Sequence, residues 1–308
     1  MRTPLSERAK GRWAGLLPLV GVEARYLSNK QGPCPMCGGK TRFRFDDRDG
    51  RGTWICNHCG AGDGADLAMK VTGRDFRDLA ERVDELLGSV PAQPTRPRAS
   101  ADTCRESLRR LWRETAPVVT GDPVSLYLAS RVGLRDVPRC IRTVGRLRYH
   151  DEEPSWHPAM VAMVSGPDGV PATLHRTYLT QEGRKAPVEA PRRLMPGAIP
   201  EGAAIRLFEA GPVLGIAEGI ETALAASSLF HVPTWAAVSS GMLAKWVPPE
   251  TTREVVVFGD GDAKFGGQAA AYALAHRLAL KGLQVRVEIP SRPGTDWNDI
   301  LLDVGCAA

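Results

Sequence analysis

Two carboxylates stand two residues apart at the end of an apolar run. Residues 255–258 are all valine or phenylalanine, and they lead directly into a Gly-Asp-Gly-Asp sequence that contains Asp260 and Asp262. Such a run is typical of a buried parallel strand, and ligands bind at the carboxyl ends of these strands. The spacing can aim both carboxylates at one point, where they would repel each other without a cation. The pattern therefore predicts a divalent-metal site at Asp260 and Asp262.

Two further acidic clusters follow other apolar runs. Residues 213–217 predict a short buried strand that ends at Glu218, and Glu221 stands in the first turn of the alanine-rich helix that follows. Asp296 and Asp299 come after a later predicted strand. Any one of these acids could simply cap a helix or occupy its first turn. Three clusters at successive strand ends favour one shared site instead.

Four of the seven cysteines form two Cys-x-x-Cys pairs. Cys34 and Cys37 are followed, after eighteen residues, by Cys56 and Cys59. This spacing is typical of a structural zinc site, in which four thiolates complete the tetrahedron and leave no open position for catalysis. His58 could replace Cys59 as a ligand, although the four cysteines already suffice. The other three cysteines are scattered, so we expect bound Zn²⁺ and a cytoplasmic location rather than a disulfide framework.

The segment between the two cysteine pairs alternates basic and aromatic residues. Alternation along a strand places Arg42 and Arg44 on one face and Phe43 and Phe45 on the other. We expect the two phenylalanines to form the core of a small ribbon. Arg42, Arg44 and Trp54, on the returning strand, are a candidate surface for single-stranded nucleic acid, through phosphate contacts and base stacking.

The 308 residues have room for two or three domains. Composition and motif order predict an α/β protein with the following parts: a zinc-ribbon domain with a lead-in helix over 1–65, a helical extension over 66–90, a proline-rich linker over 91–100, a helical and β-hairpin region over 101–210, and a parallel α/β domain over 211–308. No run of eighteen apolar residues occurs, so we expect no membrane span.

Apolar periodicity and turn residues predict the elements within these parts. They are packing residues at 13, 16, 17 and 20, helices to residue 87 with a break near 73, helices over 101–116 and 123–130, strands over 159–164 and 172–179, then strand 234–238 and helices 242–246 and 266–281. Charge is uneven along the chain, with a net +6 over residues 1–60 and −3 over residues 211–308. A basic N-terminal part and an acidic C-terminal part are consistent with a protein that binds a polyanion next to a Mg²⁺ site. Ordinary surface charge could have the same distribution.

The strand-end acids carry a family resemblance. Glu218-Gly after one strand, Asp260-x-Asp262 after another and a final Asp296-x-Asn298 together resemble the TOPRIM domain of bacterial-type primases, topoisomerases and some nucleases. The segments around Glu218 and Asp296 are most similar to primases of phages, plasmids and satellite elements. The cysteine segment, Cys-Pro-x-Cys-Gly-Gly-Lys-x-Arg-Phe, also resembles the zinc ribbon of those primases. One departure is that many relatives carry an acid four residues after the first glutamate, where this chain has Thr222.

The resemblance implies a DNA primase that makes short primers by nucleotidyl transfer. It implies Mg²⁺ or Mn²⁺ bound by Glu218, Asp260, Asp262 and Asp296. Its partners would be a single-stranded DNA template, NTPs and a separate replicative helicase. By the same resemblance, two basic residues that precede the TOPRIM segment would meet nucleotide phosphates or template; they are Arg176 and Lys185. Either one could instead be a solvated charge on a β-rich surface.

Two alternatives remain open at this point. A TOPRIM nuclease or topoisomerase would use the same carboxylates to cleave a phosphodiester. A topoisomerase also needs a nucleophilic tyrosine and a large gate domain, and the five tyrosines lie in no such context. The second alternative is a non-enzymatic zinc-ribbon DNA-binding protein with a degenerate site. The intact Glu218, Asp260 and Asp262 argue against it.

Overall fold

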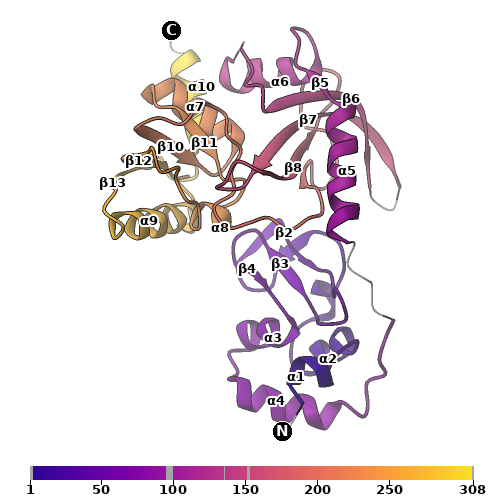
Figure 1. The fold of residues 1–308 in the computed structure, drawn as a ribbon. Helices are drawn as coiled ribbons and strands as arrows, with labels where there is room; N and C mark the ends of the chain where they lie inside the picture. The colour runs from indigo at the N-terminus through magenta and orange to yellow at the C-terminus, as the bar shows by residue number, and fades with distance from the viewer. Residues whose placement is uncertain (1–2, 95–99, 135, 151–152, 307–308) are drawn as a thin grey trace. The chain divides into compact units, whose positions relative to one another are not determined.

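The computed structural model describes residues 3–94, 100–134, 136–150 and 153–306 (Figure 1). The chain divides into two compact units, Met1–Ser100 and Ala101–Ala308. The linker predicted over 91–100 ends where the first unit ends, and its residues 95–99 lie outside the described residues.

The first unit contains a small antiparallel sheet in the order β1-β2-β3-β4. Its strands are β1 (Gly32–Cys34), β2 (Gly38–Phe45), β3 (Trp54–Cys56) and β4 (Gly60–Gly62), and its helices are α1 (Leu5–Arg8), α2 (Trp13–Leu19), the 3₁₀ turn η1 (Ala24–Tyr26), α3 (Gly64–Thr72) and α4 (Phe76–Leu86). The alternation predicted along β2 is confirmed, because Phe43 and Phe45 are buried and Arg42 is exposed.

The helices and the small sheet of this unit share one hydrophobic core. Trp13 belongs to this core and is 1% exposed. A Cβ at Gly64 would lie 2.2 Å from the Trp13 ring, and one at Gly52 would lie 2.7 Å from it. The two glycines therefore make room for the indole. The predicted packing residues, which also include Leu16, Leu17 and Val20, are all buried.

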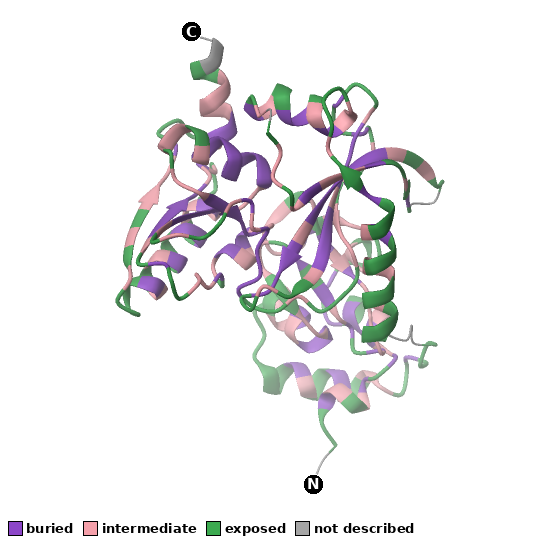
Figure 2. Ribbon diagram, turned by 45° about the horizontal axis from the view of Figure 1, so that its top comes forward, coloured by how far each residue is buried: buried purple, intermediate pink, exposed green. Residues whose placement is uncertain are grey.

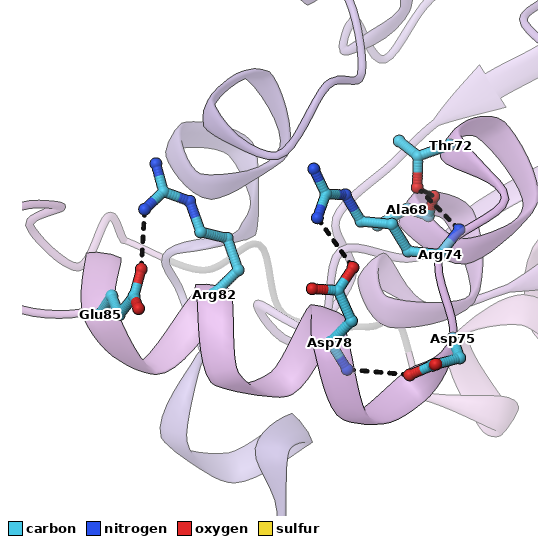
Figure 3. Close-up of polar contacts among 7 residues, drawn as sticks. All are labelled: Ala68, Thr72, Arg74, Asp75, Asp78, Arg82 and Glu85. Carbon is cyan, nitrogen blue, oxygen red and sulfur yellow. Dashed lines mark hydrogen bonds and ion pairs between the residues drawn. The ribbon is translucent and has the colours of Figure 1, made fainter.

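The turn between α3 and α4 is fixed by local capping (Figure 3). Gly73, with φ +73°, ends α3 in the left-handed conformation that favours glycine. The Asp75 carboxylate accepts a hydrogen bond from the Asp78 N–H at 2.9 Å and caps α4. Arg74 pairs with Asp78 at 2.8 Å. The predicted break near residue 73 is confirmed.

The chain that follows α4 folds back onto the same unit. Val90 is buried in the shared core, and the Arg12 guanidinium donates hydrogen bonds to the Leu87 and Val90 carbonyl oxygens. The Gln93 N–H donates to the Gly11 carbonyl at 2.7 Å. The first residues of the predicted linker are therefore held against the folded unit.

The second unit begins with an antiparallel sheet in the order β5-β6-β7-β8-β9. Its elements are α5 (Ala101–Glu114), β5 (Ala116–Pro117), α6 (Pro123–Val132), β6 (Ile141–Tyr149), β7 (Ser155–Ser165), β8 (Pro171–Tyr178) and β9 (Arg192–Leu194). The sequence did not predict β6. Its apolar residues are interrupted by Gly145 and by the exposed Arg146 and Arg148, which obscure the period of two.

A parallel sheet in the order β11-β10-β12-β13 follows. Its elements are β10 (Val213–Ala217), α7 (Ile220–Phe230), β11 (Thr234–Ala236), α8 (Ser240–Leu243), β12 (Glu254–Phe258), α9 (Gly266–Ala279), β13 (Gln284–Glu288) and α10 (Trp297–Cys306). The predicted parallel α/β fold is confirmed. Helix α8 begins before the predicted residue 242, because Ser239 accepts a hydrogen bond from the Met242 N–H and caps it.

Alternate residues of β12 face two different cores. Val256 and Phe258 pack in the core that contains residues of α6 and α7, whereas Val255 and Val257 pack with α9. Burial on both faces explains why the strand has a continuous apolar run. The central strands of the unit are buried along most of their length (Figure 2).

The two sheets of the second unit are joined through neighbouring residues. Ala204 forms an antiparallel bridge with Ser165 of β7, and Ile205 forms one with Ala236 of β11. Side chains of both sheets can therefore meet at one site. Among the described residues, no helix combines the length and apolarity needed to cross a bilayer.

Candidate active site and zinc site

The four cysteines of the first unit converge. Their sulfur atoms all lie within 4.8 Å of one another, with Cys34 Sγ 3.8 Å from Cys59 Sγ and Cys37 Sγ 3.7 Å from Cys56 Sγ. Backbone N–H groups point at the sulfurs of Cys34 and Cys56 from 3.4 to 3.5 Å. Tight turns that direct N–H groups at thiolates suit a tetrahedral cation site.

The electrostatics of this cluster favour a cation. Burial and the neighbouring thiols raise the pKa of Cys56 to about 11 and also raise the pKa of Cys59. Burial opposes ionisation of Cys34 as well, but N–H groups of Cys37 and Met36 lower its pKa. A metal that displaces the thiol protons relieves this crowding. The donor set fits structural zinc, and His58 is not part of the cluster.

The prediction that Trp54 lies on a binding surface is wrong. Trp54 is 2% exposed and stacks on Phe43 with ring centroids 5.8 Å apart. Its Nε1–H donates to the Asp63 carbonyl at 3.1 Å. The register pairs Trp54 with Phe45, so both side chains lie on the core face of the ribbon.

Arg42 and Arg44 lie on the other face of β2. Arg42 is exposed, and Arg44 is half-buried with a guanidinium nitrogen 3.5 Å from Asp46 Oδ2. These two cations, without Trp54, are what remains of the predicted nucleic-acid surface of the ribbon.

The acidic site is built at the carboxyl ends of β10 and β12. These strands are parallel neighbours, with Ala217 paired to Phe258, so Glu218 and Asp260 follow adjacent strand ends. Strand β10 lies between β11 and β12, which is where the strand order reverses. Crevices at such switch points bind ligands in open α/β sheets.

A backbone contact brings Asp296 to the same edge. The Gly261 N–H donates to the Thr295 carbonyl at 2.9 Å, and the Gly294 N–H donates to the Gly261 carbonyl at 2.6 Å. A Cβ at Gly261 would lie 3.0 Å from the Thr295 oxygen. The glycine between the two aspartates therefore allows the close approach that places Asp296 beside Asp260.

Asp260 is the buried centre of the edge. Its Oδ1 is buried and has no hydrogen-bond partner among the described residues. Burial, followed by the charges of Glu218, Asp296 and Asp262, raises the pKa of Asp260 to about 8. A hard divalent cation such as Mg²⁺ or Mn²⁺ would compensate this crowding of carboxylates. We call Glu218, Asp260, Asp262 and Asp296 the acidic edge.

Two members of the acidic edge also cap helices. Asp262 Oδ2 accepts from the Gly267 N–H at 2.9 Å at the start of α9. Asp296 Oδ1 accepts a hydrogen bond from the Asp299 N–H at 2.9 Å, and Asp299 Oδ2 accepts one from the Asp296 N–H at 3.1 Å. The helix-cap alternative is therefore correct for Asp296 and Asp299. The second oxygen of Asp262 and of Asp296 takes no part in these caps.

The acidic edge is more open than the cysteine cluster. Within the described part of the chain, the four cysteines are the one group of three or more His, Cys, Asp or Glu residues whose ligand atoms all lie within 4.8 Å of one another. The carboxylates of the acidic edge therefore do not close around a point by themselves. This spacing suits Mg²⁺, which commonly binds through one or two carboxylates, water and substrate phosphates.

Glu221 does not belong to the acidic edge. It is 6% exposed, accepts a hydrogen bond from the Tyr127 hydroxyl, and lies 3.8 Å from Lys185 Nζ. Burial alone would raise its pKa, but the charges of Arg192 and Lys185 and the Tyr127 hydrogen bond lower it to about 2. Asn298, also buried, donates to the Arg131 carbonyl and ties α10 to α6.

Strand parity divides the basic residues. Thr177 of β8 pairs with Arg192 of β9, and Arg176 pairs with Arg193. The Arg176 guanidinium donates to the Tyr178 hydroxyl at 3.3 Å and to the Leu194 carbonyl at 3.0 Å. Arg176 therefore lies on the opposite face of β8 from Thr177 and is bound to groups of its own sheet, which favours a structural role over the predicted contact with nucleotide phosphates or template.

Lys185, Arg192 and Arg131 are cations whose charges act at the acidic edge, Arg131 through Asp296. The charge of Asp296 acts on Lys185, and the charge of Arg192 acts on Asp260. Arg192 was not among the predicted site residues. The sequence signal for Arg192 was the adjacent Arg192-Arg193 pair. Successive side chains of a strand point to opposite faces, so only one of the two arginines can face the site.

Three family models match the chain. Residues 29–65 match the zinc-binding domain of primase-helicase, and residues 213–307 match the Toprim domain. Residues 102–207 match a domain of unknown function, DUF7146.

Two solved primase structures are similar at low identity. The zinc-binding and RNA polymerase domains of the Aquifex aeolicus primase are 14% identical, with a TM-score of 0.44, over 99% of this chain and 83% of that chain. The primase fragment of the bacteriophage T7 primase-helicase is 14% identical, with a TM-score of 0.41, over 90% of this chain and 96% of that chain. The family models carry the assignment by domain: residues 213–307 form a Toprim domain, and residues 29–65 form a zinc ribbon of the primase-helicase type.

Proposed function

We propose that the chain is a DNA primase that synthesises short primers on single-stranded DNA. In this reaction a primer 3′-hydroxyl attacks the α-phosphorus of an incoming NTP, and pyrophosphate leaves. The observation that carries the proposal is the buried Asp260 Oδ1, which has no hydrogen-bond partner in the described part of the chain and lies among three further carboxylates, together with a primase-type zinc ribbon.

Each residue of the acidic edge has a proposed role. Asp260 and Asp262 would hold Mg²⁺ or Mn²⁺, which when bound would neutralise phosphate charge and orient the displacement. Glu218 would be a further ligand or would accept the 3′-hydroxyl proton. Asp296 would hold a second ion or position the triphosphate. Lys185 would face the phosphates, which keep excess negative charge when a divalent ion is bound.

The zinc ribbon would hold the template. Arg42 and Arg44 lie away from the ribbon core, where they could contact phosphates of single-stranded DNA. The proposed setting is the cytoplasmic replication fork of a phage, plasmid or other mobile element, with a separate helicase as partner. This setting rests on the resemblance of the strand-end motifs.

The direct test is primer synthesis. The protein is incubated with single-stranded DNA, labelled NTPs and Mg²⁺, and the products are sized, with Asp260→Asn as the control for a contaminating polymerase. We expect short oligonucleotides from the unmodified protein alone. Cleavage of the DNA instead would favour a TOPRIM nuclease, and the absence of both activities would favour a non-enzymatic DNA-binding protein.

A further inference from the structure

A buried anion lies beside the acidic edge without joining it. Glu221, in the first turn of α7, is 6% exposed, and Tyr127 of α6 is 2% exposed. Two groups contact the Glu221 carboxylate, the Tyr127 hydroxyl from α6 and the Lys185 ammonium from the β8–β9 loop. The charge of Arg192 on β9 also acts on Glu221, and the charge of Glu221 acts on the buried His175 of β8.

The contacts of Glu221 hold its carboxylate toward these groups. Oε1 accepts from the Tyr127 hydroxyl and lies 3.8 Å from Lys185 Nζ. Oε2 lies toward the start of the helix, since a Cβ at Gly219 would be 3.7 Å from it. A carboxylate in the first turn of a helix is further stabilised by the helix dipole. Rotation toward the acidic edge would leave the buried Tyr127 hydroxyl without this acceptor.

Glu221 and Asp260 therefore suit opposite partners. Asp260 presents a buried oxygen that has no partner among the described residues, as expected of a group that receives a cation. The Glu221 oxygen already contacts a hydroxyl and an ammonium. A divalent ion bound there would be repelled by Lys185 and Arg192.

Lys185 lies within electrostatic reach of both groups of acids. Its ammonium lies 3.8 Å from Glu221 Oε1, and the charge of Asp296 also acts on it. Its backbone is fixed by an antiparallel bridge to Leu179. A lysine side chain has four rotatable bonds and loses substantial conformational entropy when it is ordered. An ion pair at its ammonium group in the free protein therefore reduces the entropy lost when a phosphate binds.

We propose that Glu221 is a positioning residue: with Tyr127 as its support, it holds the Lys185 ammonium beside the acidic edge for the triphosphate of an incoming nucleotide, and it does not bind the catalytic metal. The proposal rests on the proposed function for the identity of the ligand. It assigns a role to the acid that stands three residues after Glu218, where relatives carry theirs one residue later.

The experiment separates metal binding from nucleotide binding. Full-length Glu221→Gln protein is titrated with Mn²⁺, followed by electron paramagnetic resonance, and with a fluorescent ATP analogue. We expect Mn²⁺ affinity within about twofold of the unmodified protein and nucleotide affinity about tenfold weaker, since the loss concerns one charge-assisted phosphate contact. Asp260→Asn should lose Mn²⁺ binding.

A double-mutant cycle tests the link to Lys185. If Glu221 acts through Lys185, Lys185→Ala and Glu221→Gln together should weaken nucleotide binding little more than Lys185→Ala alone. The matched control is the exposed pair Lys245 and Glu201, 2.8 Å apart, whose disruption by Lys245→Ala should leave both affinities unchanged. Tyr127→Phe, which keeps the ring, should weaken nucleotide binding less than Glu221→Gln.

Three results would overturn the proposal. They are loss of Mn²⁺ binding by Glu221→Gln as severe as that by Asp260→Asn, unchanged nucleotide affinity, and full additivity with Lys185→Ala. Should Glu221→Gln fail to fold, Glu221→Asp and Tyr127→Phe provide the same two titrations. Both titrations are read without primer synthesis, so failure of the proposed polymerase activity is distinguishable from failure of this assignment.

Discussion

The cysteine cluster and the acidic edge differ in how much of a metal site the chain supplies. In the first unit four sulfur atoms lie within 4.8 Å of one another, and backbone N–H groups support them. At the edge of the parallel sheet, one buried carboxylate oxygen has no partner within the residues that the structure describes, and Asp262 and Asp296 each use an oxygen to cap a helix. One site is closed by the protein, whereas the other is left open.

This difference follows from what each ion has to do. A structural zinc ion contributes to folding, so all four of its ligands belong to the chain. A catalytic Mg²⁺ must share its coordination sphere with phosphates, and a closed cage of carboxylates would exclude them. Substitutions at the two sites should therefore have different consequences.

The largest effect is expected at the cysteine cluster. Cys34→Ser with Cys37→Ser should release zinc and unfold the first unit, because the ribbon and helices share one core and metal binding contributes about 10 kcal/mol or more to such sites. The second unit has its own cores and should stay folded. Zinc content by atomic absorption and protease digestion mapped to each unit would check this. A near-zero zinc content in the unmodified protein would show the ribbon assignment to be wrong.

Substitutions at the acidic edge should reduce activity without unfolding the protein. Asp260→Asn or Asp262→Asn removes charge without changing side-chain size, so primer synthesis should fall by about 1,000-fold or more while circular dichroism is unchanged. Synthesis at a near-normal rate by both variants would remove the metal assignment.

The cations beside the acidic edge should have an intermediate effect. Lys185→Ala should slow synthesis on every template by about 30- to 1,000-fold, equivalent to roughly 2–4 kcal/mol of transition-state stabilisation, because the triphosphate loses a charge partner. Sites of initiation should not change. Arg176→Ala provides the comparison, since Arg176 lies on the other face of β8 and should affect stability more than rate. A shift in initiation sites at full rate would mean that Lys185 reads template instead.

Sequence reasoning succeeded where a local pattern determines the structure. Three local patterns predicted the structure correctly. They are the cysteine spacing, the apolar run before Asp260 and the alternation of Phe43 with Arg42. The parallel sheet followed from such runs, since a strand buried on both faces has few other solutions.

It failed where distant residues decide. Trp54 is buried because its cross-strand neighbour is Phe45, and Arg192 reaches the site because its partner is Thr177. Register of this kind is set by pairing across the sheet and not by composition. The environment of Glu221 likewise depends on Tyr127, which is 94 residues away in the chain.

The smallest effect concerns the stability of the acidic edge as a function of pH. Asp260 has a folded-state pKa of about 8, above its value of about 4 in an unfolded chain, so the unfolded state ionises first as pH rises. The free energy of unfolding of the second unit should therefore decrease between about pH 4 and pH 8. Asp260→Asn should remove much of this slope and be more stable than the unmodified protein at pH 8, by about 2 kcal/mol.

Saturating Mg²⁺ should flatten the slope of the unmodified protein as well, because the bound ion stabilises the carboxylate. Urea unfolding of the full chain in Mg²⁺-free buffer, read by hydrogen exchange in peptides of the second unit, would measure both slopes. Equal slopes for the two proteins would mean that Asp260 ionises normally, and the acidic edge would then need no cation to relieve it.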